Sequence, residues 1–214
     1  MGKYTGVIFD LDGVICFTDH YHYLAWKSVA DEIGVYFDET INNRLRGVSR
    51  MDSLEIILER SERVYSREEK EALAEKKNNL YRELLGNMTE KDLSEEVRTT
   101  LDALRGMGLK LAIGSSSKNT KFILSRIGLG EFFDAISDGT NITRSKPDPQ
   151  VFQMAAQFLG LEPAQCLVVE DAEAGIAAAV AGGFDSAGLG EAAACGKATY
   201  AMQSFSDLLK ICRE

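Results

Sequence analysis

The chain of 214 residues is long enough for one large domain, or for a core with a smaller insert. It contains 45% hydrophobic and 27% charged residues, an ordinary globular composition that can bury a sizeable core. Its formal net charge of −9 argues against nucleic acid and an anionic membrane as partners. One local basic patch would still be able to hold a phosphate group.

The cysteine and histidine content indicates neither a disulfide framework nor a zinc site. The four cysteines form no Cys-x-x-Cys pair, and the two histidines, His20 and His22, have no cysteine at zinc-finger spacing. The first apolar run is short and ends at Asp10, unlike a signal peptide, and no stretch approaches a membrane span. We therefore expect a cytoplasmic protein with reduced thiols, acting as a monomer.

Apolar, β-branched runs alternate with helical patterns along most of the chain, which predicts a parallel sheet with crossover helices. The expected strands are Gly6–Phe9, Lys110–Ile113, Ala135–Ile136, Cys166–Val169 and Ser186–Leu189. The expected crossover helices are Glu95–Arg105, Lys121–Ile127, Gln150–Leu159 and Ala174–Ala181.

Residues 17–91 differ from the rest because they are charged and helical and contain no strand-like run. The stretch Glu59–Glu75, dense in charged residues, is typical of a solvated helix face. We predict an α/β protein: a Rossmann-like parallel-sheet core formed by residues 1–16 and 92–214, with residues 17–91 inserted as a helical cap domain.

The first predicted strand ends in Asp10-Leu11-Asp12-Gly13, which places carboxylates where open α/β sheets bind ligands. Two acids this close repel each other unless a cation lies between them, and oxygen ligands of this kind favour magnesium. A simple turn is the alternative. A calcium loop is excluded, because Val14, Ile15 and Tyr21 stand where that loop needs an acid or amide, a glycine and a glutamate.

Three further polar segments are expected at the same sheet edge. Ser115-Ser116-Ser117-Lys118-Asn119 and Glu170-Asp171 follow two other predicted strands, and Ser145-Lys146-Pro147 adds a cation. Each alone has a plainer interpretation, as a helix N-cap, a helix start or a surface lysine. Together they suit phosphoryl transfer, in which a carboxylate carries the phosphoryl group, cations and hydroxyls hold it, and a second acid moves a proton.

These residues resemble the four motifs of the haloacid dehalogenase superfamily of phosphotransferases. The matching text is Asp10-Leu11-Asp12-Gly13-Val14, Ser115, Lys146-Pro147 and Glu170-Asp171, in order along the whole chain. The resemblance implies that Asp10 is the nucleophile, Asp12 the general acid and base, and Ser115 and Lys146 the other catalytic groups. It places Mg²⁺ among Asp10, the backbone carbonyl of Asp12, Glu170 and Asp171. An acid at position 12 favours phosphatase or mutase chemistry over dehalogenation.

A basic loop in the predicted cap, Arg44-Leu45-Arg46-Gly47-Val48-Ser49-Arg50, bears on the substrate. It is either solvated surface charge or a grip on a second phosphate, because arginine matches phosphate oxygens with a fork of donors. A simple phosphatase holds one phosphate, whereas a sugar phosphomutase holds two in its bisphosphate intermediate.

The cap and the serine-rich segment resemble the β-phosphoglucomutase family. The resemblance implies substrate-binding roles for Thr18, His22, Trp26, Gly47, Val48, Arg50, Ser53, Lys77, Ser116, Ser117, Lys118 and Asn119. The loop with Gly47, Val48 and Arg50 would contact the sugar phosphate, and His22 and Lys77 would lie near the acid/base and the sugar. Trp26 as cap core, His22 as an ordinary helix residue and Lys77 as a solvated charge are the alternatives.

The expected activity is the interconversion of β-glucose 1-phosphate and glucose 6-phosphate through an aspartyl-phosphate enzyme and β-glucose 1,6-bisphosphate. A sugar-phosphate phosphatase and a non-catalytic phosphate-binding regulator are the alternative hypotheses. Three departures from the family pattern affect fine substrate preference but leave the core motifs intact: Cys16-Phe17, Ala172 and the alanine-rich segment Glu191–Ala198.

Overall fold

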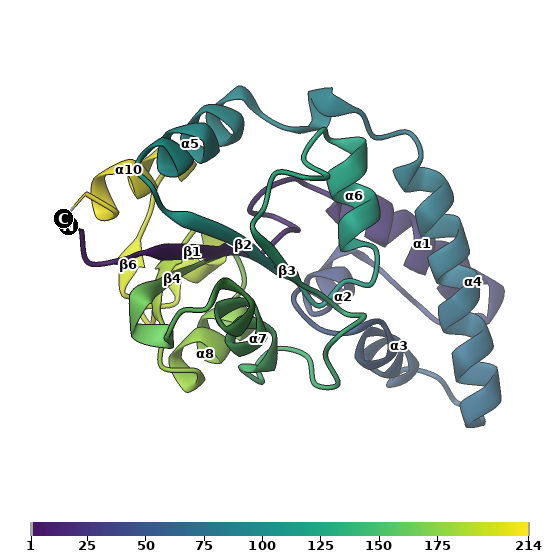
Figure 1. The fold of residues 1–214 in the computed structure, drawn as a ribbon. Coiled ribbons are helices and arrows are strands. Elements are labelled where there is room, and N and C mark those ends of the chain that lie inside the picture. The colour runs from purple at the N-terminus through teal and green to yellow at the C-terminus, as the bar shows by residue number, and fades with distance from the viewer. Residues whose placement is uncertain (1, 214) are drawn as a thin grey trace.

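The computed structural model describes residues 2–213 and contains a six-stranded parallel sheet in the order β3-β2-β1-β4-β5-β6 (Figure 1). The strands are β1 (Gly6–Phe9), β2 (Lys110–Gly114), β3 (Ala135–Ser137), β4 (Cys166–Glu170), β5 (Asp185–Gly188) and β6 (Tyr200–Ala201). The order runs outward from β1 in both directions, so the chain reverses its winding beside β1. Ligands bind at this type of position in open α/β sheets, outside the carboxyl ends of the strands.

Strand β1 lies at the centre of the sheet, and all four of its residues are buried. Phe9 pairs with Ile113 of β2 on one side and with Val169 of β4 on the other. A strand buried on both faces reads as a continuous apolar run, which Gly6–Phe9 is. The residues that follow these three strands therefore emerge next to one another at one edge.

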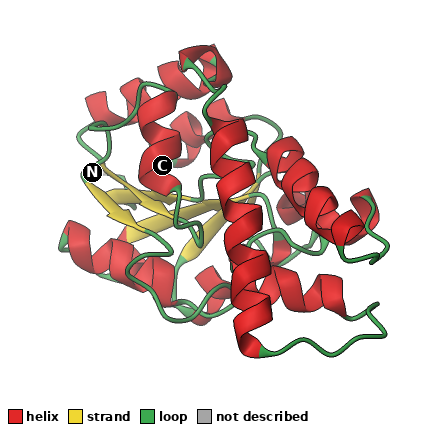
Figure 2. Cartoon of the chain, turned by 90° about the vertical axis from the view of Figure 1, so that its right-hand side faces the viewer, coloured by secondary structure: helices red, strands yellow, loops and turns green. Residues whose placement is uncertain are grey.

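Helices cover both faces of the sheet, because successive side chains of a strand point to opposite faces. Val7 and Phe9 pack in a cluster with residues of α5 (Glu95–Gly106), α6 (Thr120–Arg126) and α10 (Leu208–Ile211). Ile8 belongs to the cluster on the other face, with residues of α7 (Gln150–Leu159) and α8 (Glu173–Ala181). Figure 2 shows the resulting three layers, with the strands between helices.

The segment after β1 is helical: α1 (Asp19–Glu32), α2 (Glu39–Asn43), α3 (Arg50–Leu58) and α4 (Arg67–Leu85). These helices have an apolar cluster of their own around Trp26, Leu54 and Ile57, and they lie beside the carboxyl edge of the sheet (Figure 1). Ser66 and Glu69 form a capping box that starts α4. The exact division into a core of residues 1–16 and 92–214 and a cap of residues 17–91 stays a prediction.

The α/β fold with a parallel sheet and helical insert is confirmed, with element ends shifted by a residue or two. Strand β5 begins at Asp185 rather than Ser186, and Glu170 is the last residue of β4 rather than part of the turn after it. The two-residue strand β6 and the short helix α9 (Gly190–Ala194), within the alanine-rich segment, were not predicted. No helix among residues 2–213 is long and apolar enough to cross a membrane.

Candidate active site

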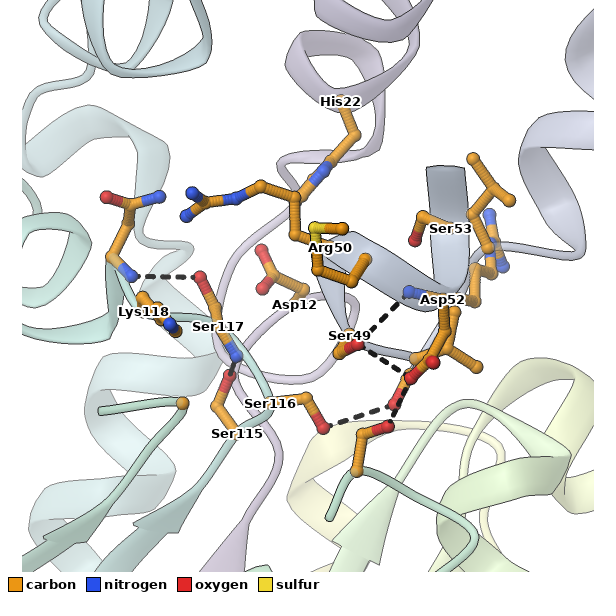
Figure 3. Close-up of a pocket in the computed structure, with 18 of the residues that line it drawn as sticks. Asp12, His22, Ser49, Arg50, Asp52, Ser53, Ser115, Ser116, Ser117 and Lys118 are labelled. Atoms are coloured by element: carbon orange, nitrogen blue, oxygen red, sulfur yellow. Dashed lines mark hydrogen bonds between the residues drawn. The ribbon is translucent and has the colours of Figure 1, made fainter. Parts of the chain in front are cut away.

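A cavity of about 1000 Å³ lies between the carboxyl edge of the sheet and helices α1, α3 and α4. Nearly all the predicted site residues line it: Asp10, Asp12, His22, Trp26, Gly47, Val48, Arg50, Ser53, Lys77, Ser115, Ser116, Ser117, Lys118, Asn119, Glu170 and Asp171. Thr18 and Lys146 are absent from the lining, but each bonds directly to a lining carboxylate. The fold thus brings the residues predicted from distant segments to one place (Figure 3).

At the sheet end of this cavity, Lys146 is buried between two carboxylates. Its Nζ donates to Asp10 Oδ1 at 2.5 Å and to Glu170 Oε1 at 2.5 Å. Burial alone would lower the pKa of this lysine, but the two carboxylates raise it, so the ammonium stays charged. Backbone amides of Asp171 and Ala172 donate to the other oxygen of Glu170, at 2.9 and 3.0 Å. The lysine and these amides fix Glu170 beside Asp10.

The acids at this end outnumber the cations. Asp10, Glu170 and Asp171 each offer an oxygen, and these oxygens lie within 4.8 Å of one another. Burial and the negative charge of Asp10 and Glu170 raise the pKa of Asp171 to about 8, and burial also raises the pKa of Glu170. A compact cluster of hard oxygen donors whose charge is incompletely compensated fits a divalent cation such as Mg²⁺. Gly13, with φ of +93°, makes room for Asp171, since a Cβ there would lie 2.1 Å from its Oδ2.

Asp12 is not part of the acid cluster, and its Oδ1 accepts a hydrogen bond from the Thr18 hydroxyl. Burial and the neighbouring charge of Asp10 raise the pKa of Asp12 to about 7, while the Thr18 bond acts in the opposite direction. A carboxyl group that titrates near neutral pH can both give and take a proton there. The two acids two residues apart therefore have different surroundings, as a nucleophile and a proton-transfer group would need.

The serine-rich segment wraps the cavity between β2 and α6. Ser117 N donates to Ser115 Oγ, and Asn119 N donates to Ser117 Oγ, both at 3.1 Å (Figure 3). These bonds, from backbone amides to serine hydroxyls, fix local turns in the cavity wall. The N-cap of α6 is Asn119, whose side chain makes no capping hydrogen bond, so the serines do not cap this helix. Asn119 is buried, and its Nδ2 donates to Asn78 Oδ1 of α4 at 2.9 Å, which connects the segment to the cap helices.

The three arginines of the basic loop have different environments. Arg44 pairs with Glu59 at 2.8 Å, and Arg46 pairs with Asp19 at 2.5 Å. Arg50, the first residue of α3, makes no ion pair among residues 2–213 and faces the cavity with its pKa lowered by burial. Arg44 is therefore an ordinary surface charge. Of the three arginines, Arg50 is the one that stays a candidate for binding a second phosphate. Gly47 has a φ of +74°, a conformation that favours glycine, and a Cβ added there would lie 3.7 Å from Ala174 Cβ, so the loop approaches the core at this point.

A second buried cation lies in the cap wall of the cavity. Lys77 is 3% exposed, lies over the rings of Trp26 and Tyr81, and contacts His22 Nδ1 at 2.9 Å. Burial and the charge of Arg50 lower its pKa to about 7, and burial holds the pKa of His22 well below 6.5. Lys77 is thus not a solvated charge. Trp26 is both a cap-core residue and part of the cavity wall.

Several lining residues were not predicted as site residues, and four of them carry polar contacts in the site: Asp19, Arg46, Asp52 and Asn78. Arg46 pairs with Asp19 of α1, and its other terminal nitrogen lies 3.9 Å from Asp171 of the acid cluster. The Ser49-x-x-Asp52 spacing is a helix N-cap signal that could have indicated a special role for Asp52 at the start of α3. Nothing in the sequence pairs Arg46 with Asp171, which are 125 positions apart.

Comparison with known proteins agrees with this geometry. The family model of haloacid dehalogenase-like hydrolases matches residues 4–183. The chain belongs to this family. It is 41% identical to β-phosphoglucomutase of Bacillus subtilis (strain 168) over 204 residues, covering 94% of this chain and 90% of that protein. It is 32% identical to the fructose-1-phosphate phosphatase YqaB of Escherichia coli (strain K12), covering 86% and 95%.

A solved haloacid dehalogenase-like structure repeats the fold of the whole chain. The crystal structure of β-phosphoglucomutase from Clostridium difficile superposes with a TM-score of 0.90 and is 37% identical, covering 96% of this chain and 93% of that one. The likeness to β-phosphoglucomutases inferred from the motifs is thereby confirmed. The relatives include both mutases and phosphatases, so the fold alone does not separate the two activities.

Proposed function

We propose that the chain is a phosphomutase that interconverts β-glucose 1-phosphate and glucose 6-phosphate. The observation that carries the proposal is one cavity with two opposite electrostatic needs. Its sheet end has an excess of carboxylates around Asp10, and its cap wall has Arg50 without an ion-pair partner among residues 2–213. A sugar bisphosphate together with a divalent cation would satisfy both. The cation would offset the carboxylates so that one phosphoryl group can lie at Asp10, and the other phosphate would lie at Arg50.

In the proposed mechanism, Asp10 carries a phosphoryl group as an aspartyl phosphate. Asp12 takes the proton from the 6-hydroxyl of β-glucose 1-phosphate as that oxygen attacks, which gives β-glucose 1,6-bisphosphate and frees Asp10. The bisphosphate then reorients in the cavity so that its 1-phosphate lies at Asp10. Asp10 accepts the phosphoryl group from O1. Asp12 then returns the proton to O1, and glucose 6-phosphate leaves.

The other site residues support these steps. Lys146 keeps Asp10 in place and neutralises the transferring group, together with Ser115 and the amides after it. Mg²⁺ would be held by Asp10, Glu170, Asp171 and the carbonyl of Asp12, and when bound it would neutralise charge on the phosphoryl oxygens. The cap group consists of Thr18, His22, Trp26, Gly47, Val48, Arg50, Ser53 and Lys77; Ser116, Ser117, Lys118 and Asn119 face it from the core. We further propose a cytoplasmic monomer without nucleic-acid or membrane partners.

The test is a coupled assay of glucose 6-phosphate formation from β-glucose 1-phosphate with magnesium, with and without catalytic β-glucose 1,6-bisphosphate. We expect turnover that depends on magnesium, is abolished by chelator, and is primed by the bisphosphate. Full activity in chelator would contradict the metal assignment.

A phosphatase is the second candidate, because the same Asp10 and Asp12 pair also suits hydrolysis and because relatives with that activity cover the chain. Phosphate release from glucose 6-phosphate, at a rate above isomerisation and without primer, would favour it. Turnover of either kind excludes a non-catalytic phosphate-binding regulator.

A further inference from the structure

A single carboxylate connects the start of the cap helix α3 to the loop that carries Lys146. Asp52 Oδ2 accepts a hydrogen bond from Ser145 Oγ of the core at 2.8 Å and another from Ser49 Oγ of the cap at 2.6 Å (Figure 3). The backbone N–H of Asp52 donates in turn to Ser49 Oγ at 3.2 Å, so the first turn of α3 is fixed around this side chain. Asp52 is thus tied to both sides of the cavity at once.

The two ends of this connection are adjacent to the two cations of interest. Arg50 stands two residues before Asp52 in the same helical turn, and Lys146 directly follows Ser145. Despite its closeness in sequence, Asp52 forms no ion pair with Arg50 in the described chain. The carboxylate therefore holds the helix start in place without neutralising the guanidinium.

Three other hydrogen bonds cross between cap and core around the cavity, and none of them reaches the loop that carries Lys146. Thr18 Oγ1 of the cap donates to Asp12 Oδ1. Ser116 Oγ donates to the carbonyl of Gly47 at 3.2 Å, and Asn119 Nδ2 donates to Asn78 at 2.9 Å. Both core donors come from the segment after β2. Among the described residues, only the Asp52–Ser145 bond joins the cap to the segment that carries Lys146, and its carboxylate acceptor makes the hydrogen bond stronger.

We infer that Asp52 is a positioning residue that sets the separation between the Arg50 and Lys146 ends of the cavity through its hydrogen bond to Ser145. A substrate that spans both ends depends on this separation, whereas a donor that reaches only Asp10 does not. The inference rests on the proposed function in so far as the substrate holds two phosphates at once.

The kinetic test uses Ser145→Ala, which deletes the crossing hydroxyl and leaves Asp52 and Ser49 in place. We expect kcat/KM for β-glucose 1-phosphate to fall about 3- to 10-fold, the effect of one hydrogen bond, mostly through KM. Phosphorylation of the enzyme by acetyl phosphate should stay within about two-fold of the parent. The matched control is Ser125→Ala, which removes an exposed hydroxyl bond to Phe122 in α6, away from the cavity, and should change neither assay.

A double-mutant cycle separates positioning from simple loss of stability. Asp52→Ala removes the bonds to both serines, so it should cost more than Ser145→Ala alone. If the two residues act through their shared bond, adding Ser145→Ala to Asp52→Ala should cost little more. Independent, additive losses, or equal losses with the sugar phosphate and with acetyl phosphate, would overturn the inference.

Hydrogen exchange without substrate tests the connection independently of the proposed function. In Ser145→Ala, amides of residues 47–53 should exchange several-fold faster than in the parent, while strand β1 stays unchanged. If the parent does not isomerise β-glucose 1-phosphate but exchange responds in this way, the proposed function fails and the connection stands. If exchange in residues 47–53 is unchanged, or if exchange changes while kcat/KM does not, the positioning role is wrong.

Discussion

The two ends of the cavity hold their cations in opposite ways. At the sheet end, Lys146 lies between Asp10 and Glu170, and the carboxylates around it exceed its charge. At the cap end, Lys77 and Arg50 lie in the wall without an ion pair in the described chain, with their pKa values lowered by burial. The first end would gain from an added cation, and the second end would gain from an added anion.

This difference explains why the cavity suits a phosphorylated sugar together with a divalent metal better than either one alone. Isolated buried charge is costly in a folded protein, so it persists where a ligand completes the site. Under the proposed function, a divalent cation held by Asp10, Glu170 and Asp171 would compensate the carboxylates and neutralise charge on the phosphoryl group, and the remote phosphate would compensate Arg50. Each end of the cavity therefore has uncompensated charge in the described chain, negative at the sheet end and positive at the cap end.

The largest effect is expected at the sheet end, from Asp10→Asn. If Asp10 carries the phosphoryl group, turnover should fall on the order of 10⁴-fold or more, as when other enzymes lose their nucleophile. The measurement is isomerisation of β-glucose 1-phosphate by protein whose thermal unfolding is still cooperative. Substantial turnover by folded Asp10→Asn protein would refute the nucleophile assignment.

Asp12 lies between the two ends, and its role is testable through Asp12→Asn. The change keeps the size of the side chain and a hydrogen-bond acceptor for Thr18, but removes the proton that Asp12 would exchange near neutral pH. General acid/base catalysis contributes about 10²–10⁴-fold, so kcat should fall by that amount while sugar phosphate still binds. Binding is checked by calorimetry with glucose 6-phosphate. A loss well below a hundredfold would mean that another group moves the proton.

At the cap end, Arg50→Ala tests the need for an anion. A charge-assisted hydrogen bond contributes roughly 1.5–3 kcal/mol, so kcat/KM for β-glucose 1-phosphate should fall about 10- to 150-fold. Phosphorylation of Asp10 by acetyl phosphate, which brings no second phosphate, should stay within a few-fold of the parent. Arg44→Ala is the matched control, because Arg44 pairs with Glu59 at the surface of the same loop and should matter little in either assay.

If Arg50→Ala lowers both reactions equally, Arg50 serves the fold or the transfer site. The comparison between the two ends would then fail at the cap, and the phosphatase hypothesis would gain.

The residues that the sequence predicted well are those whose signal is local. Strand β1 is an apolar run that ends in two acids, so its position, its burial and the acids at its carboxyl end all follow from the seven residues Gly6 to Asp12. The serine segment and Lys146-Pro147 follow for the same reason, once parallel strands align their carboxyl ends. Strand β6 escaped prediction because two residues carry no periodic pattern, and it forms only by pairing with β5.

The sequence does not reveal which charged side chains pair with one another. The basic loop predicted three comparable arginines, but Glu59 and Asp19, each 15 or more positions away, pair with two of them and leave Arg50. Lys77 belongs to a charged helical stretch. The composition of that stretch fits an exposed lysine as well as it fits a substrate-binding one. Tyr81 is the i+4 neighbour of Lys77 on α4, but the burial of Lys77 against Trp26 is a tertiary fact, set by how α4 packs on α1.

The smallest effect is a pH dependence of stability that arises from Lys77. Its pKa is about 7 in the fold against 10.5 for an ordinary lysine, because burial disfavours the ammonium. Between these values the unfolded chain binds more protons than the folded one, so the free energy of unfolding contributed by this group rises with pH. This contribution of Lys77 to the free energy of unfolding is lost as pH falls through about 7. The slope is at most about 1.4 kcal/mol per pH unit.

Lys77→Met should therefore flatten the dependence of unfolding free energy on pH between about 7.5 and 8.5, by about 1 kcal/mol per pH unit, in urea titrations of ligand-free protein. Lys76→Met is the matched control, since Lys76 is the neighbouring lysine of α4 but is exposed and pairs with Glu32. Its variant should keep the parent slope. An unchanged slope in Lys77→Met would show that Lys77 stays charged in the fold, compensated by a group such as Asp12. The cap end would then have only Arg50 in need of an anion.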